Sequence, residues 1–319
     1  ALQAGNGALG QADRQALAQE LGEREEELLG LFNSRNARSE YLFGGFQSQT
    51  PPFVKAPDGS YSYEGDEGQR SIQIAGSKQV AINDNGKKLF VDVPNVNRVT
   101  TDTSSVTARI SLGVVEDKGA FDNDFYPAEA VSIRIGPGGE SYEIHDSADT
   151  EVPPAILATG VIEPNDGESY QIRFGGVVVT LDGELKPGDQ FQITSAPTEE
   201  KRSILETVAE LRTTLETTDD SRKGKLERRD QLSIAIQNLD NGMNQVLSVQ
   251  TSIGARMNVI ESTQNENAEL KLINQGMTAQ LSELDYAEAL SRLSFETVVL
   301  QAAQQSFVKI SGLSLFNLL

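Results

Sequence analysis

A long, regular spacing of apolar residues in the C-terminal third constrains this chain more than any other feature. The apolar positions recur at intervals of four and three residues, with one polar occupant at Gln250. Such spacing keeps one stripe on a single helical face and is typical of a coiled coil or helix bundle. At about 1.5 Å per residue it predicts a rod, and we expect its stripe to form intramolecular core. The stripe comprises Leu232, Ile236, Leu239, Met243, Val246, Ile253, Met257 and Ile260.

A second helical stretch opens the chain, from about Gln11 to Arg38. Its apolar residues return to one face, and charged residues occupy the others, as in an amphipathic helix. The stretch ends near Gly44 and Gly45, because glycine adopts the positive φ that helix ends and tight turns favour. The apolar face is formed by Leu17, Leu21, Leu28 and Phe32.

Between these helices, from about residue 52 to 197, short runs alternate between apolar and polar residues. Val131, Ile133 and Ile135 alternate with polar neighbours, as half-buried strands do. Glycine, asparagine and aspartate punctuate the runs and predict hairpin turns. The expected turns are Pro57–Ser60, Asn85 with Gly86, Gly136–Glu140, and Asp182 with Gly183.

The order of these segments predicts an α+β fold. An elongated α-helical bundle or coiled-coil rod domain is interrupted by an inserted antiparallel β-rich domain. The expected rod comprises residues 1–51 plus 198–284, and the β-rich domain comprises 52–197. Because neither helical stretch can bury its apolar stripe alone, the two should pack together, residues 11–38 on the 199–280 region.

A helix start inside the C-terminal helical region separates a third segment, residues 285–319. Asp285 precedes Glu288 by three residues, the spacing of a capping box. An aspartate at the N-cap accepts a hydrogen bond from a backbone N–H that has no partner in the helix. We therefore expect a joint at Asp285, where the rod ends and a separate assembly helix begins.

The apolar residues after this joint predict an assembly interface. They continue to the C-terminus, and no later segment follows to cover them, so a protein partner is favoured over internal core. The expected interface comprises Tyr286, Leu290, Leu293, Leu300, Phe307, Ile310, Leu313, Leu315 and Phe316.

Composition excludes several classes of function. The chain has 27 Lys and Arg residues against 47 Asp and Glu residues, a formal net charge of −20. This charge repels phosphate backbones, so nucleic acid is an unsuitable partner. Cysteine is absent, which removes disulfides and thiolate chemistry. No apolar run reaches the roughly 18 residues that a membrane span requires, and the first residues lack the pattern of a cleavable signal peptide.

No catalytic, cofactor or metal site is predicted. "GNGALG" at 5–10 matches a dinucleotide-binding pattern in its glycines only, because no strand precedes it. His145 is the only histidine, and a surface position in a strand is expected for it. Asp122 and Asp124 lack the remaining ligands of a calcium loop and predict an acidic turn.

Two groups of segments resemble bacterial flagellar proteins. "LDYAEALSRL" (284–293) and "LQAAQQSFVKISGLSLFNLL" (300–319) are similar to the C-terminus of flagellin-like axial proteins. "SRNARSEYLFGGFQSQTPPF" (34–53), "YEGDEGQRSIQIAGSKQVAIN" (63–83) and "GDQFQI" (188–193) resemble the hook-filament junction family, hook-associated protein 3.

This resemblance implies a structural protein of the extracellular flagellum, exported without a cleavable signal. It implies a ring of subunits between hook and filament, with the β-rich domain facing outward. The implied partners are further copies, hook-associated protein 1, flagellin and an export chaperone at the C-terminal helix. In the family, the partner of the C-terminal helix is an N-terminal segment, which is expected upstream of Ala1.

Three alternatives remain at this point. Flagellin shares the terminal helices, although the segments at 34–53 and 63–83 favour the junction family. A surface adhesin with a β head on a helical stalk would need a signal or an anchor. An enzyme acting on carbohydrate through the β-rich domain is the third alternative.

Overall fold

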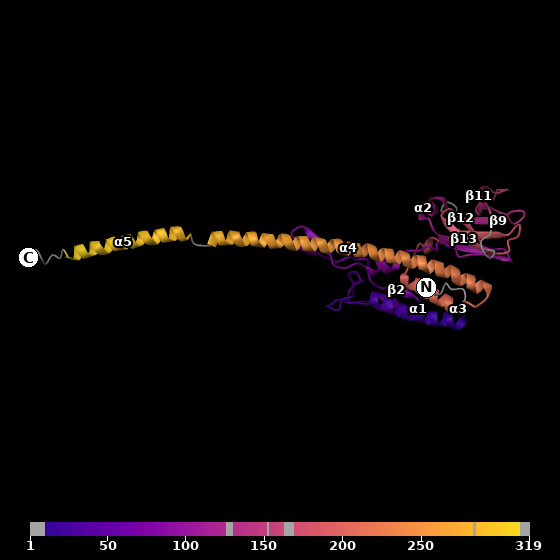
Figure 1. Ribbon diagram of the computed structural model, residues 1–319, viewed down its shortest axis with the longest axis horizontal. Coiled ribbons are helices and arrows are strands. Elements are labelled where there is room, and N and C mark those ends of the chain that lie inside the picture. The colour runs from indigo at the N-terminus through magenta and orange to yellow at the C-terminus, as the bar shows by residue number, and fades with distance from the viewer. Residues whose placement is uncertain (1–9, 126–129, 152, 163–168, 283–284, 313–319) are drawn as a thin grey trace, which may run out of the picture. The chain divides into compact units, whose positions relative to one another are not determined.

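The computed structural model describes residues 10–125, 130–151, 153–162, 169–282 and 285–312. By its contacts the chain divides into two compact units, residues 1–256 and 257–319. Helices come before and after an antiparallel β region along the chain (Figure 1), so the predicted α+β class is confirmed.

Four long helices are present in the described part of the chain. Helix α3 has a complete capping box: the Ser203 Oγ accepts from the Glu206 N–H, and the Glu206 carboxylate accepts from the Ser203 N–H. Helix α4 begins in the first unit and ends in the second. The helices are α1 (Gln11–Phe32), α3 (Ile204–Thr217), α4 (Arg222–Ser282) and α5 (Tyr286–Gly312), with shorter α2 (Lys118–Ala120), η2 (Lys87–Val91), η3 (Phe121–Phe125) and η4 (Pro197–Glu199).

Helix α1 ends six residues before the predicted boundary at Arg38. Asn33 follows its last residue, and the Asn33 Nδ2 donates to the Phe53 carbonyl at 2.8 Å while its Oδ1 accepts from the Phe53 N–H at 3.0 Å. The side chain thereby pairs with strand β1 as another strand would. This tertiary contact stops the helix, and the local sequence does not announce it.

The described strands between Val99 and Ser195 form a sandwich of two antiparallel sheets. The first sheet has the order β11 (Ile156–Val161), β10 (Ser141–Asp146), β9 (Ala130–Ile135), β14 (Gln190–Ser195), β6 (Val99–Thr103). The second has β12 (Ser169–Phe174), β13 (Val177–Gly183) and β7 (Ala108–Ile110), and β8 (Val114–Val115) also pairs with β13. One apolar cluster is shared by both sheets, and it includes Ile133 and Phe191 from the first, and Val179 and Leu181 from the second.

Six further strands lie outside the sandwich. They form three two-stranded ribbons: β1 (Phe53–Lys55) with β2 (Tyr61–Tyr63), β3 (Ser71–Ala75) with β4 (Lys78–Ala81), and β5 (Val93–Pro94) with β15 (Lys201–Arg202). The turn between β1 and β2 contains Gly59 at φ +87°, so the turn predicted at Pro57–Ser60 is confirmed.

Two of the predicted turns are wrong. Asn85 and Gly86 precede helix η2 rather than a strand. Asp182 and Gly183 belong to β13 itself, where Asp182 pairs with Arg109 of β7. The chain reverses instead at Gly175 and Gly176, both of which have positive φ.

Two other local expectations also fail. His145 lies in strand β10 as predicted but is buried, with Nδ1 3.2 Å from the Ala155 carbonyl oxygen. The "DNDF" segment is not an open turn, because it lies in helix η3. The rings of Phe121 and Phe125 stack there, and both are fully buried.

The helices of the first unit close a core of their own. Phe32 of α1 and Phe90 of η2 stack at 3.9 Å between ring centroids, and Leu205 of α3 joins them. A second cluster joins Leu21 of α1 to Leu211 of α3 and Leu232 of α4. Helices α1 and α3 therefore pack together across the intervening β region.

The stripe of α4 is only partly internal core. Leu232 is buried and Ile236 packs against the second cluster. From Met243 onward the stripe is largely exposed: Met243 is 59% exposed and Met257 is 64% exposed. The expectation of intramolecular core along the whole stripe is therefore wrong beyond its first turns, because no element of the described chain covers the rest.

A fully buried carboxylate also joins the helices. The Glu25 carboxylate of α1 lies 2.9 Å from the Arg212 Nε of α3 and 3.1 Å from the Lys55 Nζ, and the Tyr61 hydroxyl donates to it. Burial raises the pKa of the Glu25 carboxyl, but the hydrogen bonds from Tyr61, Arg212 and Lys55 outweigh it and leave the pKa below its ordinary value. Burial, followed by the Glu25 contact, raises the pKa of Tyr61 to about 12.

Replacing Glu25 should therefore change both stability and its pH dependence. We expect Glu25→Gln to lower the free energy of unfolding by about 3 kcal/mol at pH 7, because two cations lose a buried partner. Since the pKa of Glu25 is lowered on folding, its contribution is present above about pH 4.3 and is lost as pH falls through the folded-state value. Urea titrations from pH 7 to pH 3 should show a shallower acid loss in the variant.

Glu26 provides the control, because its carboxylate lies 2.7 Å from the same Lys55 Nζ but its side chain is 59% exposed. Glu26→Gln should cost no more than about 1 kcal/mol. Equal losses for the two variants would mean that the burial of Glu25 contributes nothing.

The separate clusters also predict what folds independently. The proposed β-rich domain of 52–197 contains Phe53, Leu89 and Phe90, whose cluster is completed by α1 and α3. We expect a fragment of residues 97–196 to melt cooperatively with a β-type circular dichroism spectrum. A fragment of 52–197 should melt similarly but bind an apolar dye more strongly, through its uncovered phenylalanines. A non-cooperative melt of 97–196 would contradict this.

Candidate assembly surface

Asp285 has the geometry of an N-cap at the start of α5. Its Oδ1 accepts from the Ala287 N–H at 2.9 Å and from the Glu288 N–H at 3.2 Å. Its carbonyl oxygen accepts from the Ala289 N–H at 2.8 Å, which begins the helical hydrogen-bond pattern. The aspartate therefore satisfies backbone donors that a helix leaves unpaired at its first turn.

Glu288 has a different partner from the one expected. Its carboxylate lies 3.6 Å from the Arg292 guanidinium, one turn further along α5. Both side chains are mostly exposed, so this pair adds little stability. The negative charge of Glu288 in the first turn still favours the helix dipole.

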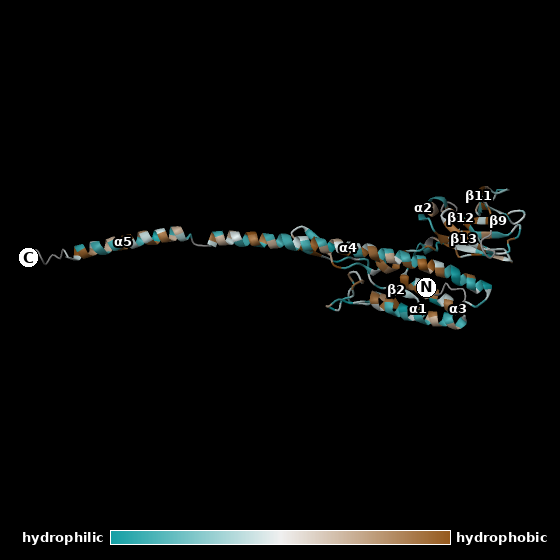
Figure 2. Cartoon of the chain, in the orientation of Figure 1, coloured by the Kyte–Doolittle hydropathy of each residue, from teal (hydrophilic) through white to brown (hydrophobic). Residues whose placement is uncertain are grey.

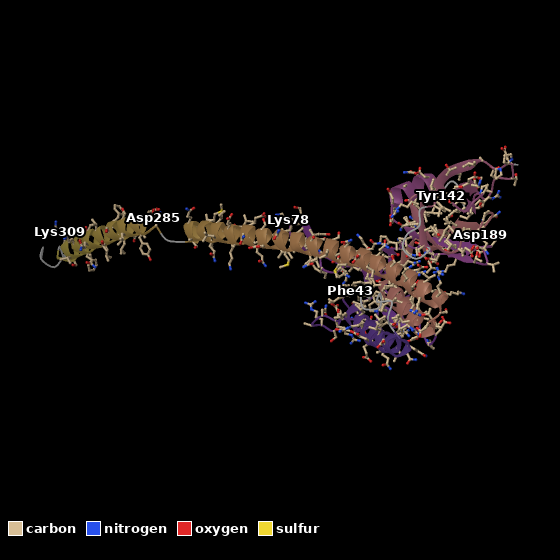
Figure 3. The ribbon with its side chains drawn as sticks, turned by 45° about the vertical axis from the view of Figure 1, so that its right-hand side comes forward. Phe43, Lys78, Tyr142, Asp189, Asp285 and Lys309 are labelled. Carbon is tan, nitrogen blue, oxygen red and sulfur yellow. The ribbon has the colours of Figure 1, made fainter. Side chains whose placement is uncertain are left out.

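The predicted interface residues on α5 are exposed. Tyr286 is 75% exposed and Phe307 is 72% exposed, and no described residue of α5 is buried. Their side chains project from the helix between Asp285 and Lys309 (Figure 3). Leu313, Leu315 and Phe316 lie outside the described residues.

Most of the predicted residues share one side of α5, which we call the seam face. With 3.6 residues per turn, Tyr286, Leu290, Leu293, Leu300 and Phe307 fall within an arc of about 100°. Ile310 lies well off this arc. Its place in the predicted interface rests only on its apolar side chain and its nearness to the terminus.

The opposite side of α5 is also apolar, and the sequence analysis missed it. Phe295, Val298 and Val299 fall about half a turn from the centre of the seam face. Each is more than half exposed, and apolar residues recur around the helix in Figure 2. The same spacing of three and four residues would have revealed this opposite face. A helix that is apolar on two sides is one that becomes buried between partners.

The described residues offer no competing chemical site. No group of three His, Asp or Glu residues among them is arranged to hold a metal ion. Within the same residues, no helix has the length and apolar character needed to cross a bilayer. The exposed apolar surface of α5 is therefore the feature that most demands a functional explanation.

The chain was compared with known protein families, sequences and solved structures. No protein-family model matches the chain. It is 21% identical over 318 residues to flagellar hook-associated protein 3 of Escherichia coli K12, covering 99% of this chain and 69% of that protein. The crystal structure of hook-associated protein 3 from Legionella pneumophila matches with a TM-score of 0.68 and 26% identity, over 89% of this chain and 86% of that one.

This chain is similar in sequence and in fold to hook-associated protein 3. A second match, the flagellar junction protein FlgL of L. pneumophila, has a TM-score of 0.66 and 28% identity. It covers 86% of this chain and 83% of that protein. Likeness to hook-associated protein 3 thus extends over the helices and the β region together, and the resemblance inferred from the sequence is confirmed.

Removal of the N-cap should loosen the start of α5 alone. We expect Asp285→Ala to cost about 1 kcal/mol of local stability, because the first-turn N–H groups lose their acceptor. Amide hydrogen exchange in the full chain should quicken at Ala287, Glu288 and Ala289. Ser291→Ala, on the same helix beyond the cap, is the control. Unchanged exchange at the first turn of the Asp285 variant would rule out the cap as a support of α5.

Proposed function

We propose that this protein is a structural subunit of the bacterial flagellum that joins hook to filament by self-assembly through its terminal helices. The observation that carries the proposal is the unpartnered apolar surface of α5 on a chain related over 99% of its length to hook-associated protein 3. Leu300 and Phe307 are each more than half exposed on the seam face.

Burial of α5 supplies the driving force. Each large apolar side chain contributes about 1.5 to 3 kcal/mol when removed from water. Most of the stability of a helix in a protein comes from the packing of its apolar face. The seam face would therefore become buried when α5 packs against helices of neighbouring chain ends.

The net charge of the chain also limits which surfaces can bind a partner. With a net charge of −20, two copies repel each other over most of their surfaces. Apolar helix faces are then the surfaces on which contact is favourable. The proposed partners are further copies in a ring, hook-associated protein 1 and flagellin, with an export chaperone covering the C-terminal helix before assembly.

The division of labour follows the proposed domains. Residues 1–51 with 198–284 act as the helical rod, 52–197 as the outward β-rich domain and 285–319 as the assembly helix. The protein would act outside the cell and be exported without a cleavable signal peptide.

The alternatives are less favoured. Flagellin and a surface adhesin explain the helical ends but not the likeness to hook-associated protein 3 over the whole chain. The relatives are structural flagellar proteins, which also disfavours an enzyme.

A single charge on the seam face should block assembly without unfolding the protein. We expect Leu300→Asp to abolish incorporation into the flagellum, because it places an unpaired carboxylate in a buried contact. The melting temperature of the purified chain should stay nearly unchanged, since Leu300 is 57% exposed and belongs to none of the apolar clusters. A motility assay in cells lacking the native gene, beside thermal denaturation, measures both.

Two further variants sharpen this test. Ser294→Asp adds the same charge midway between the two apolar faces and should assemble normally. Val299→Asp should also fail to assemble, provided that the opposite face is buried too. Normal assembly of Leu300→Asp, or a large fall in its melting temperature, would contradict the assigned role of the seam face.

A further inference from the structure

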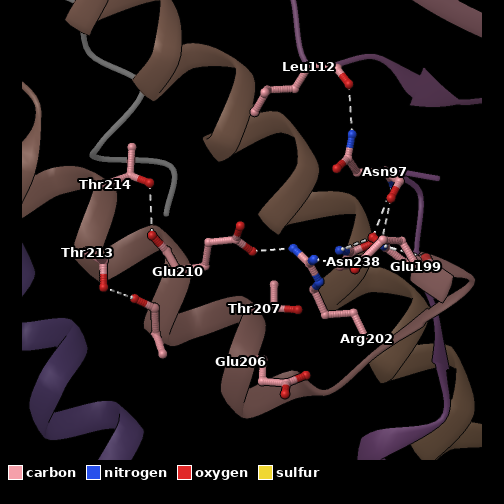
Figure 4. Close-up of polar contacts among 12 residues, drawn as sticks. Asn97, Leu112, Glu199, Arg202, Glu206, Thr207, Glu210, Thr213, Thr214 and Asn238 are labelled. Atoms are coloured by element: carbon pink, nitrogen blue, oxygen red, sulfur yellow. Dashed lines mark hydrogen bonds and ion pairs between the residues drawn. The ribbon is translucent and has the colours of Figure 1, made fainter. Parts of the chain in front are cut away.

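Two short stretches of chain connect the sandwich to the helices, and they run side by side. The Asn95 N–H donates to the Glu200 carbonyl oxygen at 3.0 Å, and the Asn95 Nδ2 donates to the Glu199 carbonyl oxygen at 2.9 Å. Arg202 pairs with Glu199 and Glu210 beside them (Figure 4). We call residues 94–98 and 196–203 the neck.

The apolar cores on the two sides of the neck are separate. Every member of the sandwich cluster lies between Val99 and Ile193. The two helical clusters take no member from that range. Ile234 of α4 is buried and lines one small cavity with Val178 of the sandwich, so some apolar contact exists. A continuous core does not join them.

Four charged residues instead bridge the sandwich and α4. The Arg109 Nη2 of β7 lies 2.7 Å from the Asp230 Oδ2 of α4. In the other direction, the Arg229 Nη1 and Nη2 of α4 lie 3.1 and 2.9 Å from the two carboxylate oxygens of Asp182 in β13. We call these four residues the clamp.

The clamp is closed on itself, and its two carboxylates are shielded from water, whereas the Arg229 side chain is 42% exposed. Arg229 also contacts Asp230 at 2.8 Å, and the Arg109 Nη1 lies 3.7 Å from the Asp182 Oδ2, so each residue meets two opposite charges. The side chains of Asp182 and Asp230 are 1% and 6% exposed. Two cations and two anions leave the clamp neutral.

An amide bridge stands beside the clamp. The Asn238 Oδ1 of α4 accepts from the Val96 N–H at 2.9 Å, and the Asn238 Nδ2 donates to the Asn95 Oδ1 at 2.9 Å. Helix α4 therefore holds the neck as well as the sandwich. All of these bonds are directional and polar.

We propose that the clamp sets the orientation of the sandwich on α4, while contributing little to the stability of either body. The cost of removing the two carboxylates from water largely offsets the attraction of the arginines, so the clamp is a weak source of stability. Its bidentate Arg229 contact nevertheless accepts one geometry. Without such a contact, two bodies with separate cores joined by a short neck move relative to each other.

The test measures orientation directly. Because the chain has no cysteine, Val161→Cys in β11 and Met243→Cys in α4 create two unique sites for spin labels, both on exposed side chains. Pulsed electron resonance on the full chain then gives the distribution of distances between sandwich and helix. With the clamp intact, we expect one narrow distribution.

The decisive variant removes the charges of the helix alone. Arg229→Gln with Asp230→Asn keeps the net charge and leaves Arg109 and Asp182 to pair within the sandwich. The distribution should broaden or gain a second distance, while the melting temperatures stay unchanged. Arg229→Lys keeps the positive charge but cannot make the two parallel hydrogen bonds of a guanidinium, so it should broaden the distance distribution less. Glu116→Gln, which breaks the exposed pair with Arg173 at 3.5 Å, should leave it narrow.

Two results would overturn the proposal. An unchanged narrow distribution in the double variant would assign the orientation to the neck or to Ile234. A markedly lower melting temperature of the sandwich or of the helices would make the four residues part of a folding core.

Discussion

The fold depends on one apolar cluster that closes the chain on itself. Phe32 at the end of α1, Phe90 of η2 and Leu205 at the start of α3 meet there, and all three are buried. The sandwich lies between these segments in the sequence. Closing a long loop costs little more than closing a short one, because the entropy grows only with the logarithm of its length. The inserted sandwich is tolerated because it has an apolar core of its own and because its two ends lie side by side at the neck.

Buried charges then specify how the closed pieces meet. The Glu25 carboxylate collects Arg212, Lys55 and Tyr61 from three different elements, and the clamp joins two sheet strands to α4. Apolar surfaces attract without regard to direction. An ion pair that is fully hydrogen-bonded accepts only one arrangement, and a buried carboxylate left alone is costly. In this protein, apolar burial holds each body together, and the buried charges align its elements.

Helix α5 combines opposite requirements in one segment. In the proposed role it must remain soluble before assembly, yet it carries apolar residues on two faces, such as Leu300 on one and Val299 on the other. The N-cap at Asp285 supports the helix start through bonds within α5 itself, from the Ala287 and Glu288 N–H groups. In the proposed function, the net negative charge of the chain keeps copies apart until their apolar faces align. The similarity to a protein named as a flagellar junction protein supports the proposal that α5 becomes buried on assembly.

The amino-acid sequence by itself determined the order of elements, the α+β class, the strands at Val131–Ile135 and the helix start at Asp285. Each of these depends on residues that are near neighbours in the chain, where periodicity and capping act directly. Only the tertiary structure decided the rest. Asn33 stops α1 by pairing with Phe53, and the exposed half of the α4 stripe lacks a cover in the described chain. Asp182, which resembles a turn residue beside Gly183, is a buried strand residue because two arginines from distant segments neutralise it. Local patterns record the conformation that a segment prefers, whereas the partner that a buried charge finds depends on how the whole chain packs.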